Sequence, residues 1–184
     1  MLSGRRLDLL DPSPLDIEIE DIALGLSRVA RWNGQTTGDH GFSVAQHSIL
    51  VLDLLEAAAK PPSLMLRRAA LLHDASEFVT ADLITPFKAV LGDSYKSLEN
   101  RIQCAVHLRF GLPAHLTEDQ HATIKRADRE SAFHEAVTLA GFSEEEARRI
   151  FAFRRPLRTD PLVAWSAEES RERFMQRFRV LYGG

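Results

Sequence analysis

Apolar residues recur at helical spacing along most of this chain, and this pattern constrains the fold more than any other feature of the sequence. The apolar segments are bounded by helix signals: Ser43 suits an N-cap, and Pro61 and Pro62 end the helix that follows it. One alternating run, residues 16–20, predicts at most a short edge segment of strand. We therefore predict an all-α fold of about seven helices with no substantial sheet. The helices are expected at about residues 22–30, 43–59, 63–77, 93–110, 118–140, 143–151 and 165–181.

The size and composition of the chain indicate one ordinary globular domain, expected over residues 1–184. This length is enough for a single well-buried core, and 45% of the residues are hydrophobic. A net charge of −3 argues against non-specific nucleic-acid binding, and no stretch approaches the ~20 apolar residues of a membrane helix. Cys104 is the single cysteine, which excludes an intrachain disulfide, and the N-terminal residues make no convincing signal peptide. We expect a cytoplasmic protein with neither a nucleic-acid nor a membrane partner.

One histidine interrupts an apolar face of the helix expected at residues 43–59. Positions 44, 47, 51, 54 and 58 share that face, and His47 is the only polar residue among them. A buried imidazole must be hydrogen-bonded or hold a metal, because an unsatisfied polar group is unfavourable in an apolar interior. Taken alone, His47 favours a core histidine that bonds a backbone carbonyl.

Three further residues change that interpretation. His73 and Asp74 end the apolar run of the helix expected at residues 63–77, where adjacent positions lie ~100° apart and can border one point. Asp128 lies on the inward face of a later helix, and a buried aspartate needs a cation. Together with His47, these residues are predicted to converge on one divalent metal.

The predicted donor set consists of two imidazole nitrogens and two carboxylates. It suits one divalent transition metal (Mn, Co, Fe, Ni or Zn) better than Ca. Four protein ligands leave room for water and a substrate oxygen when the metal takes a higher coordination number. A water bound to such an ion has its pKa lowered toward neutrality, which makes a hydroxide nucleophile available. The pattern therefore favours hydrolysis.

Five short segments, in order within residues 20–135, carry the remaining sequence signals. They are Arg31-Trp32, Ser43-Val44-Ala45-Gln46-His47-Ser48, His73-Asp74-Ala75-Ser76-Glu77, Thr80-Ala81-Asp82-Leu83 with Thr85-Pro86, and Lys125-Arg126-Ala127-Asp128. Together they resemble the HD-domain superfamily of metal-dependent phosphohydrolases, most closely its bacterial 5'-deoxynucleotidase branch.

That resemblance implies a single HD domain, folded as a helical bundle and commonly a homodimer. The metal-site core would cover about residues 20–135, with C-terminal helices at 143–181. Two departures from the branch stand out: Gln46 replaces the usual glutamate, and residues 33–42 lack the usual Arg-Thr-Glu-Asn character. These departures leave the implied metal ligands intact and the substrate range open. The implied ligands are His47, His73, Asp74 and Asp128.

The resemblance also implies roles for residues around the metal. Glu77, one turn after the histidine–aspartate pair, would lie near the reacting phosphate as a general acid or base; the alternative is a surface glutamate. Asp82, in a helix-breaking loop, would be a second catalytic residue beside Glu77 and accept hydrogen bonds from sugar hydroxyls. The alternative is that Asp82 simply caps a turn. Arg31 would grip phosphate and Trp32 would stack on base or sugar, unless the pair is structural. Lys125 is a second candidate for phosphate charge.

These signals predict a metal-dependent phosphohydrolase, most simply a 5'-nucleotidase that releases phosphate from (deoxy)nucleoside monophosphates. One alternative is hydrolysis of another phosphate ester, such as a nucleoside triphosphate or a signalling nucleotide. A second is a non-catalytic nucleotide-binding HD protein, and a third is a di-iron oxygenase with two metals. His107 and His115 lie where some HD proteins carry second-metal ligands, but they show no paired-ligand spacing, which favours one metal.

Overall fold

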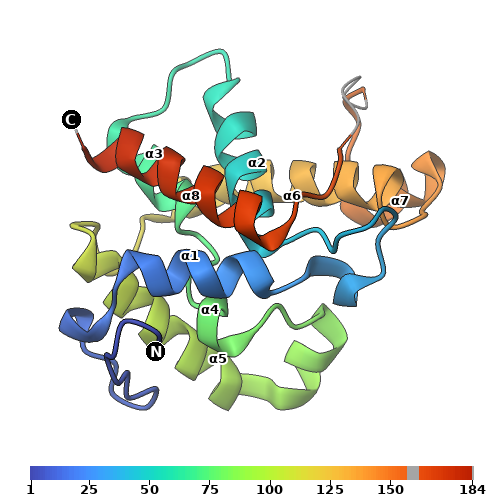
Figure 1. Cartoon of the computed structure of the whole chain (residues 1–184). Helices are drawn as coiled ribbons and strands as arrows, with labels where there is room; N and C mark the ends of the chain where they lie inside the picture. The colour runs from blue at the N-terminus through green and yellow to red at the C-terminus, as the bar shows by residue number, and fades with distance from the viewer. Residues whose placement is uncertain (157–161, 184) are drawn as a thin grey trace.

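The structure is a computed structural model that describes residues 1–156 and 162–183 (Figure 1). Within these residues it contains eight α-helices, two short 3-10 helices and no sheet, which confirms the all-α prediction. No helix in the described part is long and apolar enough to cross a membrane. The elements are η1 (Pro14–Asp16), α1 (Ile19–Arg28), η2 (Arg31–Gly34), α2 (Val44–Glu56), α3 (Leu64–Leu71), α4 (Glu77–Thr80), α5 (Thr85–Arg109), α6 (Glu118–Thr138), α7 (Glu144–Phe151) and α8 (Ala167–Tyr182).

Helix α2 forms the centre of the bundle and packs against α1, α3, α6 and α8. Ser43 begins it as predicted, because its side chain accepts a hydrogen bond from the backbone N–H of Gln46. Helices α1 and α8 run side by side in front of α2, and α6 passes behind it (Figure 1). Residues 44–52 of α2 are all buried, so the polar side chains among them must find partners inside the fold.

The strand-like run at residues 16–20 does not form a strand. Ser13 and Pro14 begin the 3-10 helix η1, and α1 already starts at Ile19. Ile17 is buried between these two elements, and no strand lies beside the run in the described part of the chain. The alternation therefore marks a buried isoleucine in a connection, and the prediction of an edge segment is wrong.

The helix predicted over residues 63–77 is interrupted near its end. Helix α3 stops at Leu71, the backbone turns through residues 72–76, and the short helix α4 begins at Glu77. Leu72, at φ −104° and ψ 13°, has already left helical geometry. His73 and Asp74 therefore lie on a turn between two helices rather than inside one helix.

Helix α5 begins earlier than the predicted residue 93. Its start is Thr85, and Pro86 occupies the first turn, where the missing N–H of proline leaves no helical hydrogen bond unmade. Gly92 departs from helical geometry at φ 68°, so the helix is kinked there. The predicted start coincides with this kink.

Helices α1 and α4 touch closely at Gly25. A Cβ atom on Gly25 would lie only 2.8 Å from the backbone oxygen and the Cβ of Phe78. Only a residue without a side chain permits this approach. The contact seats α4, with Glu77 at its first position, against the bundle.

Candidate metal centre

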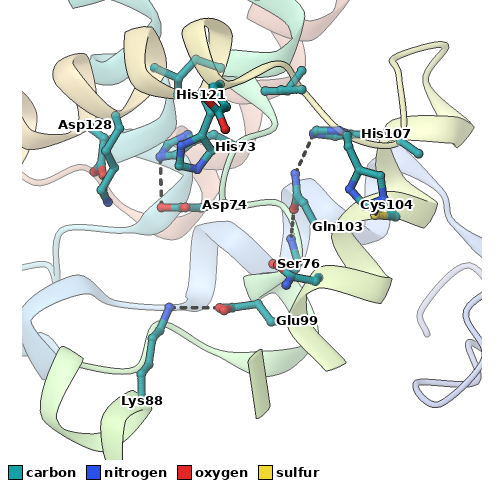
Figure 2. Close-up of a pocket in the computed structure, with 17 residues that line it drawn as sticks. His73, Asp74, Ser76, Lys88, Glu99, Gln103, Cys104, His107, His121 and Asp128 are labelled. Carbon is teal, nitrogen blue, oxygen red and sulfur yellow. Dashed lines mark hydrogen bonds and ion pairs between the residues drawn. The ribbon is translucent and has the colours of Figure 1, made fainter. Parts of the chain in front are cut away.

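Four side chains singled out in the sequence come together between α2, α6 and the turn that joins α3 to α4. His47 Nε2 lies 3.5 Å from Asp74 Oδ2 and 3.3 Å from Asp128 Oδ1. His73 Nε2 lies 3.1 Å from Asp74 Oδ2, and the two imidazole centroids are 5.2 Å apart. Figure 2 shows His73, Asp74 and Asp128 close together. One ligand atom each from His47, His73 and Asp128 lies within 4.8 Å of the other two, a spacing that one metal ion can bridge.

Both histidines direct an unused nitrogen into this centre. His47 Nδ1 bonds Glu135 Oε1 at 2.6 Å, and His73 Nδ1 bonds the backbone oxygen of Ala70 at 2.9 Å. The Nε2 atom of each ring is buried and makes no well-aligned hydrogen bond among the described residues; its nearest polar neighbours are carboxylate oxygens 3.1–3.5 Å away. A buried nitrogen left this way is unfavourable unless a cation binds it, and a ring that donates through Nδ1 presents its Nε2 lone pair to a metal. The residues present therefore fit one divalent transition metal.

The charges around His47 also favour a cation. Burial works to raise the pKa of Asp128, but the hydrogen bond and charge of His47 hold it well below its usual value. Burial likewise opposes ionisation of Asp74, but His73 and His47 keep its pKa well below the usual value. Burial and Arg31 work to lower the pKa of His47, yet the surrounding carboxylates raise it well above its ordinary value, so a metal ion bound at Nε2 would displace a proton from the ring. The centre thus holds ionised carboxylates that attract positive charge.

Glu135, which the sequence reasoning missed, is a fully buried carboxylate behind His47. Its Oε1 accepts hydrogen bonds from His47 Nδ1 at 2.6 Å and from Ser131 Oγ at 2.7 Å. Burial would raise its pKa, but the charges of Arg31 and His47 hold the pKa well below the usual value. Such a carboxylate orients a metal-binding imidazole and increases its basicity. The available signal was spacing, because Ser131 and Glu135 continue the face of α6 that carries Asp128.

Arg31 and Trp32 are joined to the centre through Glu135. Arg31 Nε lies 2.7 Å and Trp32 Nε1 lies 2.9 Å from Glu135 Oε2. Arg31 also pairs with Asp82, with Nη1 3.5 Å from Oδ2. The Trp32 ring packs on Phe142, with centroids 5.6 Å apart. Arg31, Trp32 and Asp82 thus lie in one network, and their contacts with a nucleotide stay predictions.

Glu77 begins α4 as a buried carboxyl group, and its Oε2 has no hydrogen-bond partner in the described part of the chain. Burial, together with the charges of Asp74 and Asp82, raises the pKa of Glu77 to about 9. Lys88, absent from the sequence predictions, lies 3.4 Å from Glu77 Oε1 and 3.0 Å from Glu99 Oε1, and it works to lower that pKa. A carboxyl group that retains its proton near neutral pH can act as a general acid.

A cleft of about 560 Å³ opens onto the centre between α5 and α6 (Figure 2). His73, Asp74 and Asp128 line it, as do the cationic side chains of Lys88 and Lys125. Lys125 pairs with Asp128 across one turn of α6. Polar and charged groups beside a volume of this size suit a small organic phosphate. Four residues predicted to act on the nucleotide do not line this cleft: Arg31, Trp32, Glu77 and Asp82.

The histidines considered for a second metal lie elsewhere in the same cleft. His107 Nδ1 bonds the backbone oxygen of Pro113 at 3.0 Å, and His115 Nδ1 lies 3.6 Å from Cys104 Sγ. Neither imidazole belongs to a group of three metal-binding side chains within the residues that the structure describes.

Comparisons with known proteins show which family and which relatives this chain resembles. The 5'-deoxynucleotidase YfbR-like family matches residues 24–142, a range that includes every predicted ligand and Glu135. An uncharacterized protein of Rhodobacter capsulatus is 61% identical over 151 residues, which cover 82% of this chain and 77% of the relative. The uncharacterized protein YfdR of Escherichia coli is 38% identical over 98 residues, which cover 53% of this chain and 49% of the relative.

Proposed function

Since the chain belongs to the YfbR-like 5'-deoxynucleotidase family, we propose that it is a metal-dependent phosphohydrolase that releases phosphate from nucleoside 5'-monophosphates. Deoxyribonucleotides are the preferred class in this proposal. The observation that carries it is the pair of buried Nε2 atoms of His47 and His73, which make no well-aligned hydrogen bond and face ionised Asp74 and Asp128. A cation beside the phosphate would stabilise the negative charge on the phosphoryl oxygens during transfer.

His47, His73, Asp74 and Asp128 would hold the ion, which is one of Mn, Co, Fe, Ni or Zn. When bound, a divalent ion supplies Lewis acidity at the phosphate and lowers the pKa of water. The protein contributes the orientation of the ligands, since both imidazole Nδ1 atoms are fixed by Glu135 and by the backbone of Ala70.

Glu77 is suited to the proton transfer that ends the reaction. Water adds its oxygen to phosphorus, the bond from phosphorus to the 5'-oxygen breaks, and the departing oxygen takes a proton. Glu77, with a pKa raised to about 9, holds a proton to give. A cation beside Asp74 would lower that pKa toward neutrality, where one carboxyl group can both give and regain a proton.

The positive side chains nearby are suited to bind the phosphate. Lys88 and Lys125 line the cleft at the metal centre, and each is already paired with a carboxylate there. Arg31 uses Nε and Nη1 for Glu135 and Asp82, and its Nη2 is outside those two pairs. We assign phosphate binding to Arg31 and Lys125. Asp82 would bind the sugar, and Trp32 would stack on the base or the sugar.

A phosphate-release panel tests the proposal. Purified protein is assayed on ribo- and deoxyribonucleoside mono- and triphosphates with Mn²⁺, Co²⁺ or Mg²⁺. Release from 5'-monophosphates, faster with deoxyribose than with ribose, is the expected result. Release only from a triphosphate or a cyclic or signalling nucleotide would replace the substrate class, and no release with any metal would leave a binding protein. Glu168→Gln, at an exposed site on α8, serves as a control that should retain full activity.

The remaining sequence expectations stay predictions: a single HD domain over residues 1–184, a homodimer, and a cytoplasmic location. Light scattering of the purified chain tests the homodimer.

A further inference from the structure

The turn that carries His73 and Asp74 is not held by helical hydrogen bonds alone. Between α3 and α4 the backbone bonds are short-range, with Ala75 N–H donating to Leu72 O at 3.1 Å and Glu77 N–H donating to Asp74 O at 3.0 Å. Bonds of this kind leave the angle between two helix ends less fixed than a continuous helix does. A metal centre needs its ligands fixed, so the turn requires support from outside.

Gln103 on α5 gives that support at both ends of the turn. Its Nε2 donates to Leu72 O at 2.7 Å, and its Oε1 accepts from Ser76 N–H at 3.0 Å. Leu72 and Ser76 immediately bracket the residues that include His73 and Asp74. The amide cannot be reversed, because its NH₂ group would then face the N–H of Ser76 and its oxygen would face the carbonyl of Leu72.

His107 accepts the second N–H of the Gln103 amide, because the first donates to Leu72 O. Gln103 Nε2 lies 3.0 Å from His107 Nε2 (Figure 2). His107 Nδ1 lies 3.0 Å from the backbone oxygen of Pro113. His107 must therefore donate through Nδ1 and accept through Nε2, which requires the neutral ring. Burial lowers the pKa of His107, which keeps the ring neutral at ordinary pH. Both N–H groups and the carbonyl oxygen of the Gln103 amide are then used.

We propose that Gln103 is a positioning residue for the metal centre, clamping the turn that presents His73 and Asp74, and that His107 orients its amide. The inference rests on the metal centre of the proposed function. Neither Gln103 nor His107 is a predicted ligand, and each acts through the backbone of the turn. A purely structural role for the hydrogen bonds from Gln103 to Leu72 O and Ser76 N–H is separated from a positioning role by a measurement of ligand geometry.

The first measurement is metal affinity. Mn²⁺ is titrated calorimetrically into the whole protein, into Gln103→Leu, and into Gln176→Leu as a matched control at an exposed position of α8. Loss of a residue that orients metal ligands weakens metal binding by about 10- to 100-fold. We expect that loss in Gln103→Leu, none in the control, and a changed visible spectrum of the Co²⁺-loaded variant. A purely structural role would lower the melting temperature and leave the Kd and the Co²⁺ spectrum unchanged, which would overturn the proposal.

The second measurement is amide hydrogen exchange of the metal-free protein. Amide hydrogen exchange at Ser76 should accelerate in Gln103→Leu, because the acceptor of that N–H is removed.

Gln103→Glu keeps the acceptor for Ser76 but sets an oxygen against Leu72 O, so it should retain protection and still weaken Mn²⁺ binding. This variant carries the test if Gln103→Leu does not fold. Unchanged Mn²⁺ affinity in it would overturn the clamp.

The two hypotheses fail in different ways. A parent protein that binds neither Mn²⁺ nor Co²⁺ overturns the metal centre, and the clamp with it. A parent that binds metal, with Gln103 variants that bind equally well, overturns the clamp alone.

Discussion

The candidate metal centre has two halves that are built differently. One half comes from continuous helices, where His47 on α2 and Asp128 on α6 have side chains 0% and 14% exposed. The other half comes from the turn between α3 and α4, where the side chains of His73 and Asp74 are 10% and 25% exposed. The first half is backed by the buried carboxylate of Glu135, whereas the second is backed by backbone oxygens and one neutral amide.

The comparison shows that one metal site can combine a half held by ionised groups with a half held by neutral hydrogen bonds. The helix-borne half is fixed by charge, since a buried ion pair is lost only at a large energetic penalty. The turn-borne half is fixed by neutral hydrogen bonds, each of which stabilises the fold by about 1 kcal/mol. Substitutions in the two halves should therefore affect stability and metal binding in different proportions.

The largest effect should come from removing one ligand from each half. His47→Leu and Asp74→Asn should both abolish Mn²⁺ binding and phosphate release. Only His47→Leu should also destabilise the metal-free protein strongly, because it leaves the buried Glu135 without its imidazole partner. Calorimetric titration and thermal unfolding measure the two properties, with Asp119→Asn on the exposed face of α6 as a control. Equal destabilisation by both variants would remove the distinction between the halves.

The next effect concerns the turn-borne half and its neighbour Glu77. Glu77→Gln removes the proton that the leaving oxygen requires, so kcat should fall by about 10²- to 10⁴-fold. Mn²⁺ affinity should stay within about two-fold of the parent, since the carboxyl group is not a predicted ligand. Steady-state kinetics and calorimetry test this together. A large loss of metal affinity would instead make Glu77 a ligand.

A smaller effect on metal binding is expected in the helix-borne half. Glu135→Gln should weaken Mn²⁺ binding by about 10- to 100-fold, since the residue orients His47. The same change leaves Arg31 without the full charge of its nearest partner, and breaking a buried pair destabilises by about 3–5 kcal/mol. Urea unfolding of the metal-free variant measures the second effect. A stability equal to that of the parent would show that Arg31 is compensated by Asp82 alone.

A pH dependence of stability is also expected, with opposite sign for Glu135 and Glu77. The pKa of Glu135 is lowered in the folded chain, so its stabilisation is present above the unfolded value near 4.5 and is lost as the pH falls. The pKa of Glu77 is raised to about 9, so metal-free stability should decline as the pH rises from about 4.5 to about 9. Glu77→Gln should flatten the decline between pH 5 and 9 in urea titrations. An unchanged slope would contradict the buried, protonated carboxyl group.

The two halves also differ in how far the sequence could predict them. His47 and Asp128 lie on continuous amphipathic helices, so helical periodicity placed them on inward faces. The sequence predicts a helix through His73 and Asp74 because apolar residues run without a break up to them, whereas the chain leaves helical geometry at Leu72. Gln103 and Lys88 gave no signal, because their partners are brought near only when α5 packs across the turn. Spacing along α6 could have revealed Glu135.

The hydrogen bonds of Glu135 make Trp32 a fluorescent reporter of the metal centre. The indole N–H of Trp32 and the imidazole of His47 bond the two oxygens of one carboxylate. A cation that binds His47 therefore changes the electric field at an indole ring, and the emission of Trp32 should shift as the ion is titrated. The other tryptophan, Trp165, stacks with Arg173 and provides an internal reference. Metal occupancy could thus be followed by fluorescence in the unlabelled protein.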